Sequence, residues 1–169
     1  MDEKYTPYNH KGTKIDGVEP KHRGTPATKR GLSNQQICII TAIQRFTHTI
    51  ARTLNYGKPS SLDLLRFGEC LESKSFVMLD GSNSYNELIE SKNCTKKVLI
   101  RHESYDKFNH LNTVNSFHKL IEERLQKYKG VASKYINRYN ALFIMQRETQ
   151  GMDNTEKLQY ILLRLKNIY

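Results

Sequence analysis

The chain has 169 residues, enough for one domain with a sizeable core, and 37% of them are hydrophobic. No stretch approaches the roughly 18 consecutive apolar residues of a membrane-spanning helix, so a membrane protein is not indicated. The formal net charge of +10, from 27 basic and 17 acidic residues, favours a polyanionic partner such as nucleic acid over a merely basic solvated surface.

The three cysteines, Cys38, Cys70 and Cys94, are widely spaced and form no Cys-x-x-Cys pair. This pattern argues against a zinc ribbon and against a disulfide framework. Reduced thiols are typical of cytoplasmic proteins, and the first residues, Met-Asp-Glu-Lys-Tyr, contain no apolar signal-peptide core. We therefore expect a cytoplasmic protein.

Residues 9–34 are poor in hydrophobic residues and contain several glycines and two prolines. Such a segment cannot bury enough apolar surface to become ordered, so we expect a basic mobile loop. The side chains expected to contact a nucleic-acid backbone are Lys11, Lys14, Lys21, Arg23, Lys29 and Arg30. Phosphate contacts need charge but no fixed geometry. The alternative is a plain linker.

The next segments alternate between strand and helix patterns. The β-branched run at residues 37–43 predicts a buried strand, and residues 47–56 are its expected antiparallel partner. A helical spacing of leucine and phenylalanine follows, with Ser61 as the expected N-cap.

A second strand-and-helix region surrounds one acidic residue. Residues 76–79 are all apolar and predict a short strand that ends at Asp80. A short helix is expected at residues 83–91 and a short strand at residues 98–100.

From Leu111 onward the pattern is helical. One apolar face is formed by Leu111, Val114, Phe117, Ile121, Leu125 and Tyr128. We expect Gly130 to end this helix at the C′ position and Ser133 to cap the next one. Asp153 and Glu156 predict a capping box for a last helix. Strands first and helices last indicate an α/β or α+β domain with one mixed sheet flanked by helices.

Two acidic positions and one polar helical stripe are candidates for a metal site. Asp80 is placed at the end of a strand, where sheet-edge ligands bind, although this motif alone favours a plain Asp-Gly turn. Asp2 begins the chain together with Glu3. Asn115, His118 and Glu122 fall on one stripe of the predicted helix, beside its apolar face. A solvated flank is the alternative interpretation of that stripe.

Four motifs in this order resemble the catalytic core of insertion-sequence transposases of the DDE superfamily. They are Asp2-Glu3-Lys4-Tyr5, Leu79-Asp80-Gly81, His110-Leu-Asn-Thr-Val-Asn-Ser-Phe-His118 and Gly130-Val-Ala-Ser-Lys-Tyr135. Between Asp80 and Asn115 lie 34 residues, close to the spacing in the subgroup whose third acidic residue is Asn. The resemblance covers roughly residues 2–143.

The resemblance implies an RNase H-like fold and metal-dependent cleavage and transfer of DNA strands. Asp2, Asp80 and Asn115 would hold Mg²⁺ or Mn²⁺, and His118 would orient the substrate or Asn115. DNA, both element ends and target, is the implied partner, with a second copy of the chain on DNA as a further candidate. Residues 1–150 would form the catalytic domain and residues 151–169 a helical extension.

Three positions depart from the family pattern. They are Leu79, where Thr or Ser is usual, Gln44-Arg45, where Asp-Arg is usual, and Glu122-Glu123, where a basic residue is usual. Family members also carry an upstream DNA-binding region, so we expect an N-terminally truncated chain. The alternative function is therefore a catalytically inactive, DNA-binding transposase remnant. A basic helical scaffold or ribosome-associated protein is a third, unrelated alternative.

Overall fold

The computed structural model describes residues 1–12, 32–100 and 106–166. The strands are β1 (Asp2–Pro7), β2 (Gln36–Ile43), β3 (Thr49–Tyr56), β4 (Phe76–Leu79) and β5 (Thr95–Val98). The helices are α1 (Ser61–Gly68), α2 (Asn86–Ser91), α3 (Asn112–Lys127), α4 (Ile136–Glu148) and α5 (Asn154–Lys166), with 3-10 turns η1 (Asn83–Tyr85) and η2 (Ser133–Tyr135). The α/β class is confirmed.

The strands form two sheets among the described residues, where the sequence predicted one mixed sheet. β1, β2 and β3 pair antiparallel in that order, with Asp2 opposite Thr41, and β4 pairs parallel with β5. The backbone nitrogen of Met1 donates a hydrogen bond of 2.8 Å to the carbonyl of Met78. The start of β1 therefore lies beside β4, and this contact joins the two sheets at the point where the acidic residues emerge.

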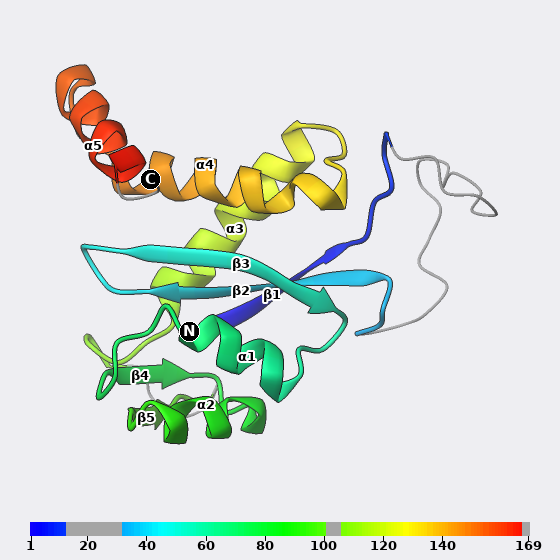
Figure 1. The fold of residues 1–169 in the computed structure, drawn as a ribbon, viewed down its shortest axis with the longest axis vertical. Coiled ribbons are helices and arrows are strands. Elements are labelled where there is room, and N and C mark those ends of the chain that lie inside the picture. Colours follow the sequence, from blue (N-terminus) through cyan, green and yellow to red (C-terminus); the bar gives the residue numbers. More distant parts are fainter. Residues whose placement is uncertain (13–31, 101–105, 167–169) are drawn as a thin grey trace.

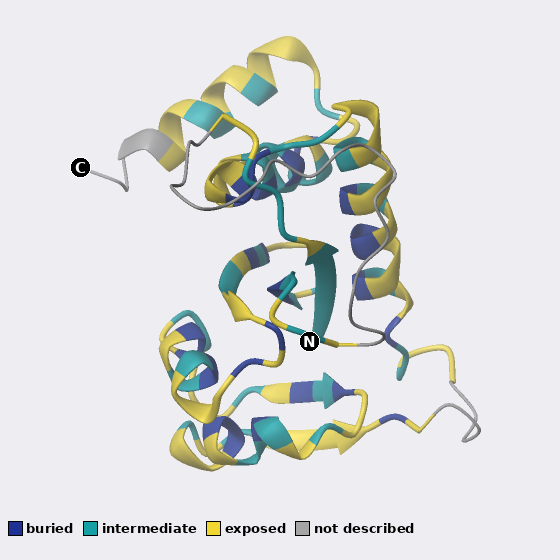
Figure 2. Ribbon diagram, turned by 90° about the vertical axis from the view of Figure 1, so that its right-hand side faces the viewer, coloured by how far each residue is buried: buried dark blue, intermediate teal, exposed yellow. Residues whose placement is uncertain are grey.

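Helices cover both faces of the three-stranded sheet (Figure 1). Successive strand residues point to opposite faces, and β2 uses this alternation fully. Ile40 packs with Leu64 of α1 in one core cluster, whereas Ile39 packs with Phe117 of α3 and Phe143 of α4 in the other. The buried positions consequently line the inward faces of the helices, while their outer faces are exposed (Figure 2).

Helix α1 begins one residue earlier than expected. Its N-cap is Ser60, not Ser61. The Ser60 side chain accepts a hydrogen bond from the backbone of Asp63, and the Asp63 carboxylate accepts one from the backbone of Ser60. Ser61 could form no such capping box, because the residue three positions after it is Leu64.

Two elements in the second half of the β4 region differ from the prediction. The helix expected at 83–91 is divided into η1 and α2. The strand expected at 98–100 is β5, Thr95–Val98, which carries two exposed lysines. An edge strand pairs on one side only and tolerates charged residues. The polar sequence of β5 therefore lacks the apolar pattern from which a strand is predicted.

The caps around α3 and α4 also differ. Lys129, with a φ of 52°, occupies the C′ position after the C-cap Tyr128, and Gly130, with a φ of 99°, follows it. Ser133 does not cap α4, because it begins the 3-10 turn η2 and the N-cap of α4 is Tyr135. Its hydroxyl accepts a hydrogen bond from the backbone of Asn9. The capping box of α5 is confirmed by reciprocal hydrogen bonds between Asp153 and Glu156.

The predicted basic loop is described only at its two ends. Asn9 exchanges two hydrogen bonds with Ser133, which fixes the start of the segment against the turn before α4. Residues 13–31 lie outside the described part of the chain. No helix among the described residues has the length and apolar character needed to cross a membrane.

Candidate metal centre

Three carboxylates gather where the start of β1 meets the end of β4. Asp2, Glu3 and Asp80 each offer an oxygen, and these oxygens all lie within 4.8 Å of one another. Asp2 and Glu3 are partly buried and Asp80 is exposed. The two aspartates that the sequence singled out are therefore brought together across a long stretch of chain.

The local backbone explains how Asp80 reaches this position. β4 ends at Leu79, which is 1% exposed and anchors the strand in the core. Gly81 then turns the chain with a φ of 98°, and the Asp80 carboxylate accepts a hydrogen bond from the backbone of Ser82. Asp80 thus belongs both to an Asp-Gly turn and to the carboxylate cluster, so the two interpretations of this residue do not exclude each other.

The electrostatics of the cluster oppose full ionisation. Burial raises the pKa of Asp2, and the nearby Asp80 charge raises it further. Burial likewise raises the pKa of Glu3, with added repulsion from Asp80 and Asp2. Carboxylates crowded in this way favour either a proton or a bound cation.

His118 lies against the cluster but is buried, not on a solvated flank. It is 6% exposed, and its Nδ1 lies 3.7 Å from Oδ2 of Asp2, too far for a hydrogen bond. Burial lowers the pKa of His118 to about 4, with a further contribution from Lys4, so the ring is neutral at pH 7. Its Nε2 is buried without a hydrogen-bond partner among the described residues.

A second contact fixes the register of β1 against α3. Lys4 forms an ion pair of 2.6 Å with Glu122, one helical turn beyond His118. From Asp2 to Lys4 the strand advances about 6.6 Å, and from His118 to Glu122 the helix advances about 6 Å. Because these two distances are similar, Asp2 can face His118 while Lys4 faces Glu122. Glu122 lies where the family usually has a basic residue, and here its carboxylate pairs with Lys4.

Asn115 is not joined to the carboxylates by any described contact. It is exposed on α3, one turn before His118 on the same stripe. Of the predicted site residues, the structure therefore brings Asp2, Asp80 and His118 together and leaves Asn115 exposed on α3.

The predicted basic contacts are mostly outside the described residues. Lys11 is exposed, and its ammonium group donates to the carbonyl of Gly130 at 3.4 Å. The other five positions lie outside the described part of the chain; they are Lys14, Lys21, Arg23, Lys29 and Arg30.

Glu3 is the site residue that sequence reasoning missed. It stands beside Asp2 in the quoted motif, but neighbouring strand residues normally point to opposite faces. Here both carboxylates reach Asp80, because Asp80 follows a strand end rather than lying within a strand. A pair of adjacent acids at the start of a strand was the available signal.

Arg45 was noted only as part of a departure from the family pattern, yet it has a structural role. Its guanidinium donates to the backbone carbonyls of Phe108 and His110, the latter at 3.0 Å. It also lies 3.9 Å from the sulfur of Met78. Arg45 thus ties the tip of the β2–β3 hairpin to the segment that precedes α3.

Replacing Asp2 by Asn should stabilise the metal-free protein at pH 7. A carboxyl whose pKa is raised in the folded state contributes stability below its unfolded pKa and loses it as the pH rises through the folded pKa. The amide removes that loss and still accepts the hydrogen bond from the backbone of Glu3. We expect the melting temperature in EDTA to rise by about 2–4 °C for each kcal/mol recovered.

Glu90→Gln is the matched control, because Glu90 is an exposed carboxylate on α2 outside the cluster. Wild type and this control should melt at higher temperature when Mg²⁺ is added, whereas Asp2→Asn should respond less. A lower melting temperature of Asp2→Asn in EDTA would contradict the raised pKa.

Comparison with known families agrees with the resemblance noted in the sequence. The model of the ISXO2-like transposase domain matches residues 1–145. This match covers most of the chain, so the chain belongs to this transposase family. No curated protein and no solved structure matches the chain.

Proposed function

We propose that this transposase-family chain is a catalytic domain that cleaves DNA strands at the ends of an insertion sequence and joins them to target DNA. The convergence of Asp2, Glu3 and Asp80 within 4.8 Å supports this proposal. A cluster of like charges at the mouth of a fold is costly unless it binds a cation, so it favours a functional over a structural role.

The donor set suits hard divalent cations. Carboxylate and amide oxygens are the ligands that Mg²⁺ and Mn²⁺ take, and Asp2, Asp80 and Asn115 would supply them in an Asp-Asp-Asn arrangement. Glu3 adds a third carboxylate. When bound, such ions activate the attacking oxygen and stabilise the leaving oxygen of a phosphodiester. The neutral ring of His118, 3.7 Å from Asp2 on the side of α3, would orient the substrate or Asn115.

The strand arrangement supports an RNase H-like fold for this domain. The order β3-β2-β1 is antiparallel, the start of β1 meets β4 through the Met1–Met78 hydrogen bond, and β4-β5 is parallel. If the two sheets are taken together across this hydrogen bond, the spatial order of the strands is β3-β2-β1-β4-β5. We assign residues 1–150 to the catalytic domain and residues 151–169 to a helical extension.

DNA is the proposed partner, and a second copy of the chain on the DNA is part of the proposal. The net charge of +10 supplies long-range attraction to phosphates. Lys11, together with Lys14, Lys21, Arg23, Lys29 and Arg30, would contact the backbone without reading bases.

The function is tested by incubating the full chain with a labelled duplex that carries the element end, in Mg²⁺, in Mn²⁺ and in EDTA. Nicking that requires the divalent ion is expected. DNA binding without nicking in either metal would instead favour the inactive, DNA-binding remnant, and the absence of both would refute the proposal.

Binding should depend strongly on salt. If about 4–6 phosphates are neutralised, the logarithm of the association constant should fall with the logarithm of salt concentration at a slope of about −4 to −5. Fluorescence anisotropy titrations between low and physiological salt measure this slope. Replacing the six loop cations together should weaken binding to all DNA sequences alike. Weaker binding to one DNA sequence, with binding to the others unchanged, would show that the loop reads bases.

A further inference from the structure

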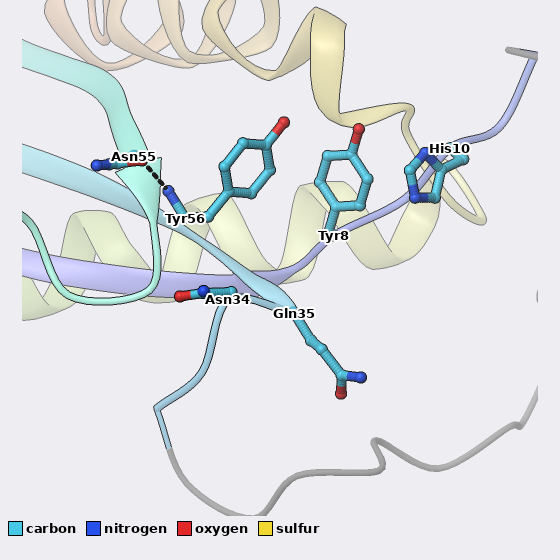
Figure 3. A pocket seen from close by; sticks show the side chains of 6 residues that line it. All are labelled: Tyr8, His10, Asn34, Gln35, Asn55 and Tyr56. Carbon is cyan, nitrogen blue, oxygen red and sulfur yellow. Dashed lines mark hydrogen bonds between the residues drawn. The ribbon is translucent and has the colours of Figure 1, made fainter. Parts of the chain in front are cut away.

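A hollow at the opposite end of the three-stranded sheet lies outside the metal centre. Its volume is about 710 Å³. It is lined by Tyr8, His10, Asn34, Gln35, Asn55 and Tyr56, which come from the segment after β1, the turn before β2 and the end of β3 (Figure 3). We propose that this hollow binds an unpaired nucleobase of a DNA strand.

The aromatic rings of the hollow form a row of edge-to-face contacts. Tyr8 and Tyr56 meet edge to face, with centroids 5.0 Å apart and planes at 73°. Tyr8 and His10 do the same at 4.1 Å and 85°. No pair in this row stacks face to face, and Tyr56, which is 49% exposed, is accessible to another flat group that would stack on its ring face. Stacking on such faces binds bases of any sequence.

Polar groups beside the rings suit the edge of a base. Asn34 is an exposed amide, and an amide can donate to and accept from a base edge at once. Asn55 is also exposed, but its amide nitrogen already donates to the Asp63 carboxylate. The Nδ1 atom of His10 is buried and has no hydrogen-bond partner among the described residues. The Asn55 carbonyl oxygen accepts a hydrogen bond from the backbone of Tyr56, which fixes its amide at the rim (Figure 3).

Charge near the hollow suits the phosphates of the same strand. Lys11 follows His10 and Lys58 follows the Tyr56-Gly57 turn, and both side chains are exposed. A free nucleotide carries the same base, but it offers only one phosphate group. A DNA strand that passes the hollow would offer phosphates on both sides of the base.

The position relative to the metal centre fits a strand that runs along the domain. Six residues of strand and its extension separate Asp2 from Tyr8, which corresponds to about 20 Å. At about 3.4 Å for each nucleotide of a DNA strand, the base would lie about six nucleotides from the carboxylates. This placement rests on the proposed function, whereas base binding itself can be measured without cleavage.

The test uses the full chain and a single-stranded oligonucleotide that carries 2-aminopurine, whose fluorescence falls when it stacks on an aromatic ring. Wild type should quench the fluorescence. Tyr56→Leu should abolish quenching and weaken binding about tenfold, the ratio that corresponds to about 1.4 kcal/mol of stacking. Tyr56→Phe keeps the ring and should retain quenching. Phe76→Leu, an equally exposed aromatic position at the start of β4, should behave as wild type.

Several outcomes would overturn the inference. Quenching by Tyr56→Leu equal to that by wild type would show that the base binds elsewhere. Binding of free 2-aminopurine nucleotide as tight as that of the oligonucleotide would assign the hollow to a nucleotide rather than to a DNA strand. Quenching by wild type without metal-dependent nicking would uphold this inference and refute only the proposed activity. Metal-dependent nicking by wild type without quenching would uphold the proposed activity and refute this inference.

Discussion

Replacing Asp80 by Asn should abolish metal-dependent nicking and leave DNA binding intact. The substitution keeps the side-chain volume but removes one charged oxygen donor from the cluster of Asp2, Glu3 and Asp80. Metal stabilisation of developing charge supplies several kcal/mol, so the nicking rate should fall on the order of 10³-fold or more. The initial rate of nicking of a labelled duplex in Mg²⁺ measures the effect.

Asp80 is the sharpest position for this test because its role in the fold is small. Its side chain is exposed, and its one described hydrogen bond, from the backbone of Ser82, can be accepted by an amide oxygen. Salt-sensitive DNA binding should persist or tighten slightly, since a negative charge near the DNA is removed.

Glu90→Gln provides the matched control, because it removes one exposed carboxylate that is not part of the cluster. It should nick DNA at the wild-type rate. If Asp80→Asn nicked as fast as this control, the activity would arise from another site or from a contaminant, and the assignment of the metal centre would be refuted.

Replacing Phe117 by Ala should cause the largest loss of stability among these variants. Phe117 is 2% exposed and packs with Ile39 of β2, and with Phe143 of α4 in the same cluster. Truncation removes buried apolar surface and leaves a cavity, at a cost of about 3–5 kcal/mol. That is a large share of the roughly 5–15 kcal/mol by which domains are stable.

Urea unfolding followed by circular dichroism measures this loss as a shift of the midpoint at unchanged slope. Asn115→Ala is the control on the same helix, two residues away but exposed. It should change the free energy of unfolding by less than about 0.5 kcal/mol. If Asn115→Ala were the more damaging substitution, the assignment of the buried and polar faces of α3 would be wrong.

The two substitutions on α3 also separate structure from chemistry. If Asn115 holds a metal ion, Asn115→Ala should lose nicking while it retains stability. Phe117→Ala should lose nicking only in proportion to the fraction of unfolded protein. This contrast connects the exposed position of Asn115 to the role that the family resemblance assigns to it.

Several features of this protein were determined by the sequence itself. The apolar run 76–79 predicts β4 and places Asp80 at its end, and the spacing of Val114, Phe117 and Ile121 predicts the buried face of α3. Both patterns succeed because they are local: a strand or helix that buries one side must repeat apolar residues at its own period. The motif order also identified the transposase family, which the family match confirms.

Other features were decided by contacts between distant segments. Ser133 was expected to cap α4, but its hydroxyl and its backbone bond Asn9, and α4 begins only after the 3-10 turn η2. The strand expected at the apolar residues 98–100 is found at Thr95–Val98, because pairing with β4 and not hydropathy determines which residues form this edge strand. In both cases the deciding partner lies outside any local window of sequence.

The metal centre and the aromatic hollow are products of the tertiary structure in the same sense. Asp2 and Asp80 meet because the start of β1 bonds to β4, and Glu3 joins them because Asp80 lies beyond a strand end. Tyr8 and Tyr56 meet because β1 and β3 both pair with β2. Sequence periodicity records which residues are buried, but which distant residues become neighbours depends on backbone pairing and packing across the whole domain.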